Sequence, residues 1–168
     1  MGTYGSHDPD TEDVCMILWS EGIAAFHTAG QYIKKYLHDN ESPIMISILA
    51  NADTLTFFAT ILSIMCLGHM PFTISIRNSV PAVTHLMKAT NSKYFVVTPD
   101  GPVQKIVDIV CHQNDDKKIT TTIPMPTFSE IFIGSYEPLL PFKRPDWKST
   151  AFIMHSSGTT RVTKRWFS

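Results

Sequence analysis

The chain has 168 residues, a length typical of one domain with its own hydrophobic core. Hydrophobic residues make up 43% of it and charged residues 17%, a composition that argues against disorder along the whole chain. Its 14 basic and 15 acidic residues are spread along the sequence and give a net charge of -1, which disfavours nucleic acid or an anionic membrane surface as a partner.

Residues 1–20 are predicted to form a flexible segment ahead of the folded part of the chain. The segment begins with polar and acidic residues, unlike a secretory signal or a mitochondrial presequence, so a cytoplasmic protein is expected. Residues 21–38 have the pattern of an amphipathic helix, in which Ile23, Phe26 and Tyr32 share one face.

The first strand–helix unit begins at residues 44–50 (IMISILA). This continuous apolar run with β-branched side chains predicts a strand covered on both faces in a parallel sheet. Asn51 or Asp53 can cap the helix that follows, and Gly68 can end it. The apolar stretch from Leu55 to Leu67 is shorter than the roughly 20 residues of a membrane span, so we expect a buried helix and no span.

Two further strand–helix units repeat the pattern. Residues 72–76 (FTISI) predict a strand, and Val80 to Thr90 predict the helix after it. Residues 93–98 (KYFVVT) predict a third strand, and the apolar spacing of residues 103–110 predicts its helix. Strands that alternate with helices imply right-handed crossovers, and therefore a partial doubly wound, mostly parallel α/β sheet with flanking helices.

The remaining part of the chain is less regular. Residues 112–118 (HQNDDKK) are interpreted as a solvated loop, and residues 129–134 (SEIFIG) as a strand. Residues 136–147 contain three prolines, which predicts an extended connection. The next strand is expected near residues 150–154.

Cysteines and histidines show no metal-binding pattern. The three cysteines, Cys15, Cys66 and Cys111, lie far apart without a CxxC pair, so neither a disulfide framework nor a zinc site is expected. The histidines lack HExxH or HxxxH spacing, and no metal site is predicted. His85 is interpreted as a packing or surface histidine, and the methionines and phenylalanines as core residues.

One segment, from Ala151 to Lys164 (AFIMHSSGTTRVTK), carries recognisable chemistry. An apolar strand runs directly into a small, hydroxyl-rich turn that is followed by a lysine. Small residues let backbone N–H groups face a phosphate, hydroxyls can donate to its oxygens, and the lysine adds positive charge. On residue types alone, an ordinary Ser/Thr turn is the alternative, because neither GxxxxGK(S/T) nor GxGxxG is present. The candidate phosphate-binding residues are Ser156, Ser157, Gly158, Thr159, Thr160 and Lys164.

HSSGTT followed by Lys164 resembles the phosphate-loop signature (T/H)-(S/T)-S-G-(S/T)-T-G-x-P-K of the adenylate-forming superfamily, the AMP-dependent synthetases and ligases. Upstream, Gly68 to Ser79 fits the family pattern G-x-x-P-F-x-I-S-x-R-N-S, and Ala82 to Leu86 fits A-x-x-H-L. The sequence is most similar to the adenylation domains of fungal adenylate-forming reductases.

The resemblance implies that residues 21–168 are the N-terminal portion of an AMP-binding (adenylation) domain. Such enzymes join a small carboxylic acid to ATP as an acyl-adenylate and release pyrophosphate, with Mg2+ offsetting the phosphate charge. The hydroxyl-rich loop would hold the β- and γ-phosphates, and His155 would help to shape the substrate or nucleotide pocket. Coenzyme A or a carrier-bound phosphopantetheine would accept the acyl group in the full-length enzyme, where carrier and reductase domains follow.

The sequence departs from the family at two positions of the loop. Arg161 stands where the family has glycine, and Thr163 where it has proline. An altered reading frame or aberrant splice after Thr160 would account for both, so we expect a truncated product that exposes apolar surface. The family's catalytic motifs follow the loop, and the chain is expected to be inactive alone. The alternatives are a non-catalytic α/β nucleotide-binding or interaction module and a small standalone nucleotide-binding protein.

Overall fold

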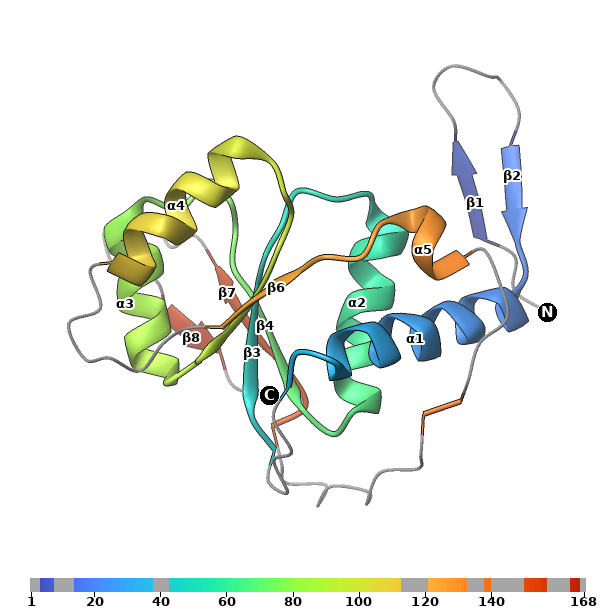
Figure 1. The fold of residues 1–168 in the computed structure, drawn as a ribbon, viewed down its shortest axis with the longest axis horizontal. Helices are drawn as coiled ribbons and strands as arrows, with labels where there is room; N and C mark the ends of the chain where they lie inside the picture. The colour runs from blue at the N-terminus through green and yellow to red at the C-terminus, as the bar shows by residue number, and fades with distance from the viewer. Residues whose placement is uncertain are drawn as a thin grey trace.

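A six-stranded sheet lies at the centre of the computed structural model of the chain (Figure 1). The structure describes residues 4–7, 14–37, 43–112, 121–132, 138–139, 150–156 and 164–166. The strands in spatial order are β6 (Thr121–Pro124), β5 (Tyr94–Val97), β3 (Met45–Leu49), β4 (Met70–Thr73), β7 (Ile153–Ser156) and β8 (Lys164–Trp166). The first five run parallel and β8 runs antiparallel to β7, which confirms the predicted mostly parallel α/β sheet.

Helices cover both faces of the sheet, as a doubly wound topology requires (Figure 1). One face carries α1 (Trp19–Lys34), α2 (Thr54–Cys66) and the short α5 (Phe128–Phe132), and the other carries α3 (Val80–Thr90) and α4 (Gly101–His112). The chain passes from β3 through α2 to β4, then returns through α3 to β5 on the other side of β3. The winding direction therefore reverses between β3 and β5.

Strand β3 shows how the sequence builds both layers. Ile46 and Ile48 belong to the apolar cluster that includes residues of α1 and α2, whereas Leu49 belongs to the cluster that includes residues of α3 and α4. This alternation explains the continuous apolar run in the sequence, because successive side chains of a strand point to opposite faces. Ser47 is the polar exception, and its buried hydroxyl donates to Ser92 Oγ at 2.9 Å.

The ends of α2 have the predicted residues. Asp53 is the N-cap, and its Oδ1 accepts a hydrogen bond from the Thr56 N–H at 2.9 Å. Gly68 follows the helix with a φ of 79°, a left-handed conformation that glycine adopts without the strain of a side chain. Among the helices that the structure describes, none has both the length and the apolar composition needed to cross a bilayer.

The strand predicted for SEIFIG is wrong. Phe128–Phe132 form the helix α5, and Thr127 and Glu130 stabilise its start because the Thr127 N–H donates to Glu130 Oε2 at 2.7 Å. This is the glutamate half of a capping box, in which the N3 carboxylate accepts from the backbone N–H at the N-cap. The polar loop predicted over residues 112–118 begins where α4 ends at His112, and its other residues lie outside the described part.

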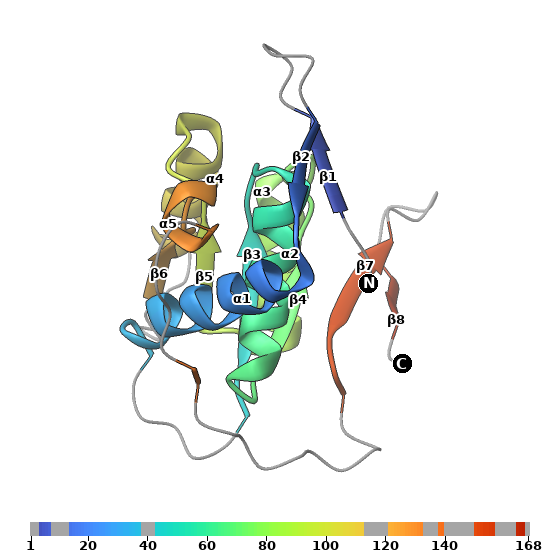
Figure 2. The same ribbon diagram turned by 90° about the vertical axis from the view of Figure 1, so that its right-hand side faces the viewer.

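An additional hairpin precedes α1. Its strands, β1 (Tyr4–His7) and β2 (Val14–Ile17), pair antiparallel with each other and form a separate two-stranded sheet. The sequence patterns did not predict these strands or β6. The flexibility expected of residues 1–20 stays a prediction. Figure 2 shows the order of the central sheet from β6 at one edge to β7 and β8 at the other.

Candidate functional site

The predicted phosphate-binding segment lies at the end of strand β7. This strand runs parallel to β4, with Ile153 opposite Phe72 and Met154 opposite Thr73. Because parallel strands end at the same edge of a sheet, β7 ends beside the carboxyl end of β4, at the edge where β3 and β5 also end. Open α/β sheets bind their ligands outside this edge.

Strand β8 returns antiparallel along β7 and fixes the far end of the segment. The register places Arg165 opposite His155 and Lys164 opposite Ser156. Three of the predicted site residues, His155, Ser156 and Lys164, are therefore in paired strands. The other four, Ser157, Gly158, Thr159 and Thr160, lie outside the described residues, as do Arg161 and Thr163.

Hydrogen bonds join the segments that follow β3 and β5. The Asn51 N–H donates to Thr98 Oγ1 at 3.0 Å, and Thr98 Oγ1 donates to Asp100 Oδ2 at 2.5 Å. The Gln104 side chain donates to the Thr98 carbonyl oxygen at 3.0 Å. The bond between Asn51 and Thr98 joins the two segments at the point where the winding reverses, and the other two bonds hold Thr98 within its own segment. The sequence pattern did not predict the hydrogen bond between Asn51 and Thr98.

The two carboxylates at this edge serve as helix caps. Asp53 accepts from the N–H of Thr56 at the start of α2, and Asp100 Oδ1 accepts from the N–H of Val103 at the start of α4, at 3.0 Å. The helix N–H groups and the helix dipole stabilise a carboxylate at the N-cap position. Neither side chain is therefore free to act as a general base without releasing a helix end.

A tight turn follows β4, the strand that neighbours β7. The Asn78 N–H donates to the Ser75 carbonyl oxygen at 3.1 Å, and the Arg77 N–H donates to Ser75 Oγ at 3.2 Å. Arg77 is exposed at the edge where β7 ends. Its guanidinium is a permanent positive charge suited to phosphate oxygens, and it was not among the predicted site residues.

Most of the pKa shifts come from burial, whereas the Thr127 backbone N–H and the Thr127 hydroxyl lower the pKa of Glu130 by hydrogen bonding. Burial raises the pKa of Tyr32 to about 12, with a further contribution from its hydrogen bond to Tyr36. Burial also raises the pKa of the Cys66 and Cys111 thiols and lowers that of His69. Within the described residues, no group of three or more His, Cys, Asp or Glu side chains could hold a metal ion. A bound Mg2+ stays a prediction.

Comparison with known proteins relates the chain to adenylate-forming enzymes. It is 27% identical over 162 residues to adenylate-forming reductase Nps10 of Heterobasidion annosum, a match that covers 88% of this chain and 15% of the relative. It is 34% identical over 64 residues to adenylate-forming reductase Nps11 of Serpula lacrymans, covering 38% of this chain and 6% of that one. No protein-family model matches the chain.

Solved structures share its fold at low sequence identity. A fatty acyl CoA synthetase of Mycobacterium tuberculosis matches 92% of this chain and 29% of its own, with a TM-score of 0.69 and 15% identity. The N-terminal domain of FACL13 from the same organism matches 92% of this chain and 37% of its own, with a TM-score of 0.68 and 18% identity. The chain therefore has the α/β fold of the N-terminal part of adenylate-forming enzymes, and it resembles an adenylate-forming reductase along most of its length.

Proposed function

We propose that the chain supplies the ATP-phosphate-binding part of an adenylate-forming domain, with the loop from His155 to Lys164 around the phosphates. The observation that supports this most strongly is the position of β7. This strand ends at the carboxyl edge of a parallel sheet, and β8 returns from the same edge so that Lys164 is opposite Ser156. Ligands of open α/β sheets bind at that edge.

The chemistry of the loop suits a polyphosphate. The hydroxyls of Ser156, Ser157, Thr159 and Thr160 would donate to the β- and γ-phosphate oxygens, and Gly158 would let the backbone approach closely. Lys164 would add a charge-assisted bond, and the exposed Arg77 would contribute a second positive charge from the neighbouring strand exit. His155, at the entry to the loop, would border the nucleotide or the acid.

The reaction of the longer relatives would begin with attack of a carboxylate on the α-phosphate of ATP. The carboxylate oxygen forms the new bond to phosphorus, the bond to the pyrophosphate leaving group breaks, and acyl-adenylate and pyrophosphate result. Mg2+ would neutralise phosphate charge, and coenzyme A or a phosphopantetheine carrier would accept the acyl group. The chain spans 15% of the Heterobasidion relative, so we assign nucleotide binding to this chain and catalysis to a longer, cytoplasmic protein with carrier and reductase domains.

A second candidate is a non-catalytic nucleotide-binding module. It is favoured by Arg161 and Thr163, which replace a glycine and a proline of the family signature. A side chain at a glycine position resists positive φ and takes up space near the phosphates. Such a loop would still offer hydroxyls and Lys164 to a phosphate.

Two assays separate these functions. Carboxylate-dependent exchange of labelled pyrophosphate into ATP, measured with a panel of small acids, would identify a working adenylating enzyme. Saturable binding of ATP without exchange would identify the binding module. The proposal fails if calorimetry detects no ATP binding at millimolar nucleotide, whichever acid is present.

A further inference from the structure

Residues 138–139 lie between α5 and β7 in the sequence, and in the structure they contact the middle of α1. The Leu139 N–H donates to Nδ1 of His27 at 3.0 Å, a bond between residues 112 positions apart. The Leu139 side chain is buried over Gly30, where a Cβ would lie 2.5 Å from Leu139 Cδ1. Because His27 and Gly30 are three residues apart on one helix, they share a face of α1. The backbone and the side chain of Leu139 therefore both attach to that face.

The hydrogen bond determines the protonation state of the His27 imidazole. A backbone N–H can only donate, so Nδ1 is the acceptor and carries a lone pair. In the neutral ring the proton is then on Nε2. A protonated imidazole has an N–H on both nitrogens and offers no acceptor. The bond to Leu139 and a proton on Nδ1 therefore exclude one another.

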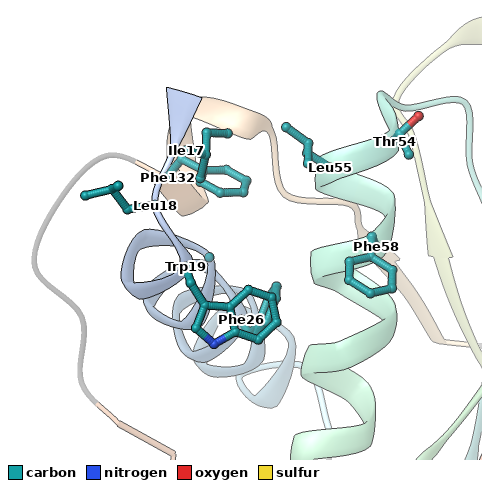
Figure 3. A pocket seen from close by; sticks show the side chains of 9 residues that line it. Ile17, Leu18, Trp19, Phe26, Thr54, Leu55, Phe58 and Phe132 are labelled. Carbon is teal, nitrogen blue, oxygen red and sulfur yellow. The ribbon is translucent and has the colours of Figure 1, made fainter. Parts of the chain in front are cut away.

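Apolar packing, which does not depend on pH, holds α1 against α2 and α5. Figure 3 shows Phe26 of α1, Phe58 of α2 and Phe132 of α5 around an apolar pocket of about 160 Å3. The rings of Phe26 and Phe58 have centroids 6.3 Å apart at an angle of 83°, a preferred edge-to-face geometry. Phe58 was expected in the core, and it is 50% exposed beside this pocket. These contacts leave α1 in place when the charge of His27 changes.

The helices that pack on α1 are α2 and α5. Besides His27, the ionisable side chains of the three helices are those of Glu21, Tyr32, Lys34, Cys66 and Glu130. Hydrogen bonds from Thr127 lower the pKa of Glu130, whereas burial raises the pKa of Cys66 and raises that of Tyr32 to about 12. Histidine is the side-chain type whose charge changes between about pH 5 and 8, and these helices contain one, His27.

We propose that the contact between His27 and Leu139 is a pH-sensitive attachment, which holds residues 138–139 on α1 while the imidazole is neutral and releases them when it binds a proton. Because the released state can bind a proton that the bonded state excludes, the contact is closed at neutral pH. It opens as the pH falls below about 6.5, where histidine titrates. Residues 138–139 precede β7 in the sequence, so release removes one attachment of the chain ahead of the strand that leads to the phosphate loop. The inference rests on the contacts of Leu139 and does not depend on ATP binding.

Hydrogen exchange of the Leu139 amide tests this contact. The rate is expressed as a protection factor, which removes the intrinsic pH dependence of exchange. The Ile74 amide, which donates to the Ile48 carbonyl oxygen at 2.8 Å, is the internal reference for opening of the whole fold. His27→Asn keeps an acceptor oxygen that does not titrate, and His27→Leu removes the acceptor. The matched control is His85→Asn, at an exposed histidine of α3.

In the unchanged protein, the protection of Leu139 relative to Ile74 should fall about three- to tenfold from about pH 7.5 to about pH 5.5, the loss expected for one hydrogen bond. His85→Asn should leave this pH dependence as it is. His27→Asn should keep Leu139 protected at both pH values, and His27→Leu should reduce its protection at both. Equal relative protection at the two pH values in the unchanged protein would overturn the inference, as would a pH dependence that persists in either His27 variant.

Discussion

Ser156 and Lys164 lie directly opposite each other across the antiparallel pair of β7 and β8. Both ends of the predicted phosphate loop are therefore tied to the sheet, because β7 also pairs with β4.

Restoring the family residues in the loop should strengthen nucleotide binding. We expect the double change Arg161→Gly with Thr163→Pro to increase ATP affinity by about tenfold, since glycine permits positive φ and proline restricts the free loop. Calorimetric titration with ATP measures the change, with Thr163→Pro alone as the control. Unchanged affinity in the double variant would show that Arg161 does not constrain the loop.

Gly30 on α1 is expected to leave space for the side chain of Leu139, a residue distant in the sequence. A Cβ at this position would lie 2.5 Å from Leu139 Cδ1, and the Leu139 N–H donates to His27 Nδ1 at 3.0 Å. We expect Gly30→Ala to reduce the free energy of unfolding by about 1 kcal/mol, because displacement of Leu139 outweighs the better helix propensity of alanine. Urea unfolding measures this difference.

Gly22 on the same helix provides the matched control. A Cβ there would meet Phe26 at 3.8 Å, an ordinary contact, so Gly22→Ala should raise the free energy of unfolding by up to about 1 kcal/mol. Equal stabilisation by Gly30→Ala and Gly22→Ala would mean that Leu139 does not occupy the space beside α1.

The elements that were predicted correctly are those with a local periodic signal. The helix predicted from Val80 to Thr90 has those bounds in the structure, because Val83, Leu86 and Met87 recur at helical spacing and are all buried. The strand predicted at residues 44–50 contains β3. The continuous apolar run predicted it because both faces of a strand inside a parallel sheet are covered.

The segment that forms α5 contains a helix-capping signal, although the apolar run within it led to the prediction of a strand. Thr127 and Glu130 have the T-x-x-E spacing of a capping box, and their side chains hydrogen-bond at 2.8 Å. The run IFIG after them favoured a strand on composition. A five-residue helix has too few turns to show helical periodicity, so only the cap could have identified it.

Pairing between strands could not be predicted from local pattern. Strand β8 (KRW) has no apolar alternation, and its place in the sheet comes from its pairing with β7. Strand β6 likewise has a single buried residue, Ile123, and lies at the edge of the sheet. For the candidate site, the sequence identified the residue types and their order, whereas the sheet edge at which they lie follows from the topology.

Removal of the buried Thr56 hydroxyl should increase the free energy of unfolding. Thr56 is 2% exposed, and its Oγ1 has no hydrogen-bond partner within the described residues. Replacing Thr56 by valine keeps the shape and removes the unpaired oxygen, so the free energy of unfolding should rise by about 1 kcal/mol. Thr60→Val is the control: Thr60 Oγ1 donates to the Thr56 carbonyl oxygen at 2.8 Å, and its loss should cost about 1 kcal/mol. Destabilisation by both changes would show that Thr56 has a partner.

His69 should make stability depend on pH. Burial lowers the pKa of His69 in the folded state, so the unfolded chain binds a proton at a higher pH than the folded protein does. The free energy of unfolding is then highest above the unfolded-state pKa of about 6.5. It falls as the pH decreases toward the lower pKa of His69 in the folded state. Urea unfolding between pH 7.5 and 5.5 tests this. His69→Leu should reduce the change in the free energy of unfolding with pH. The control, His85→Gln at an exposed histidine of α3, should not reduce it.

The central claim, that the β7–β8 loop binds the phosphates of ATP, is tested most directly by titrating ATP into the chain and into its Lys164→Ala variant. The matched control is Lys105→Ala, which removes one positive charge at an exposed position of α4. A charge-assisted bond contributes about 1.5–3 kcal/mol, so Lys164→Ala should weaken binding at least about tenfold while Lys105→Ala leaves it unchanged. Equal ATP affinity in all three proteins would contradict the assignment of the loop.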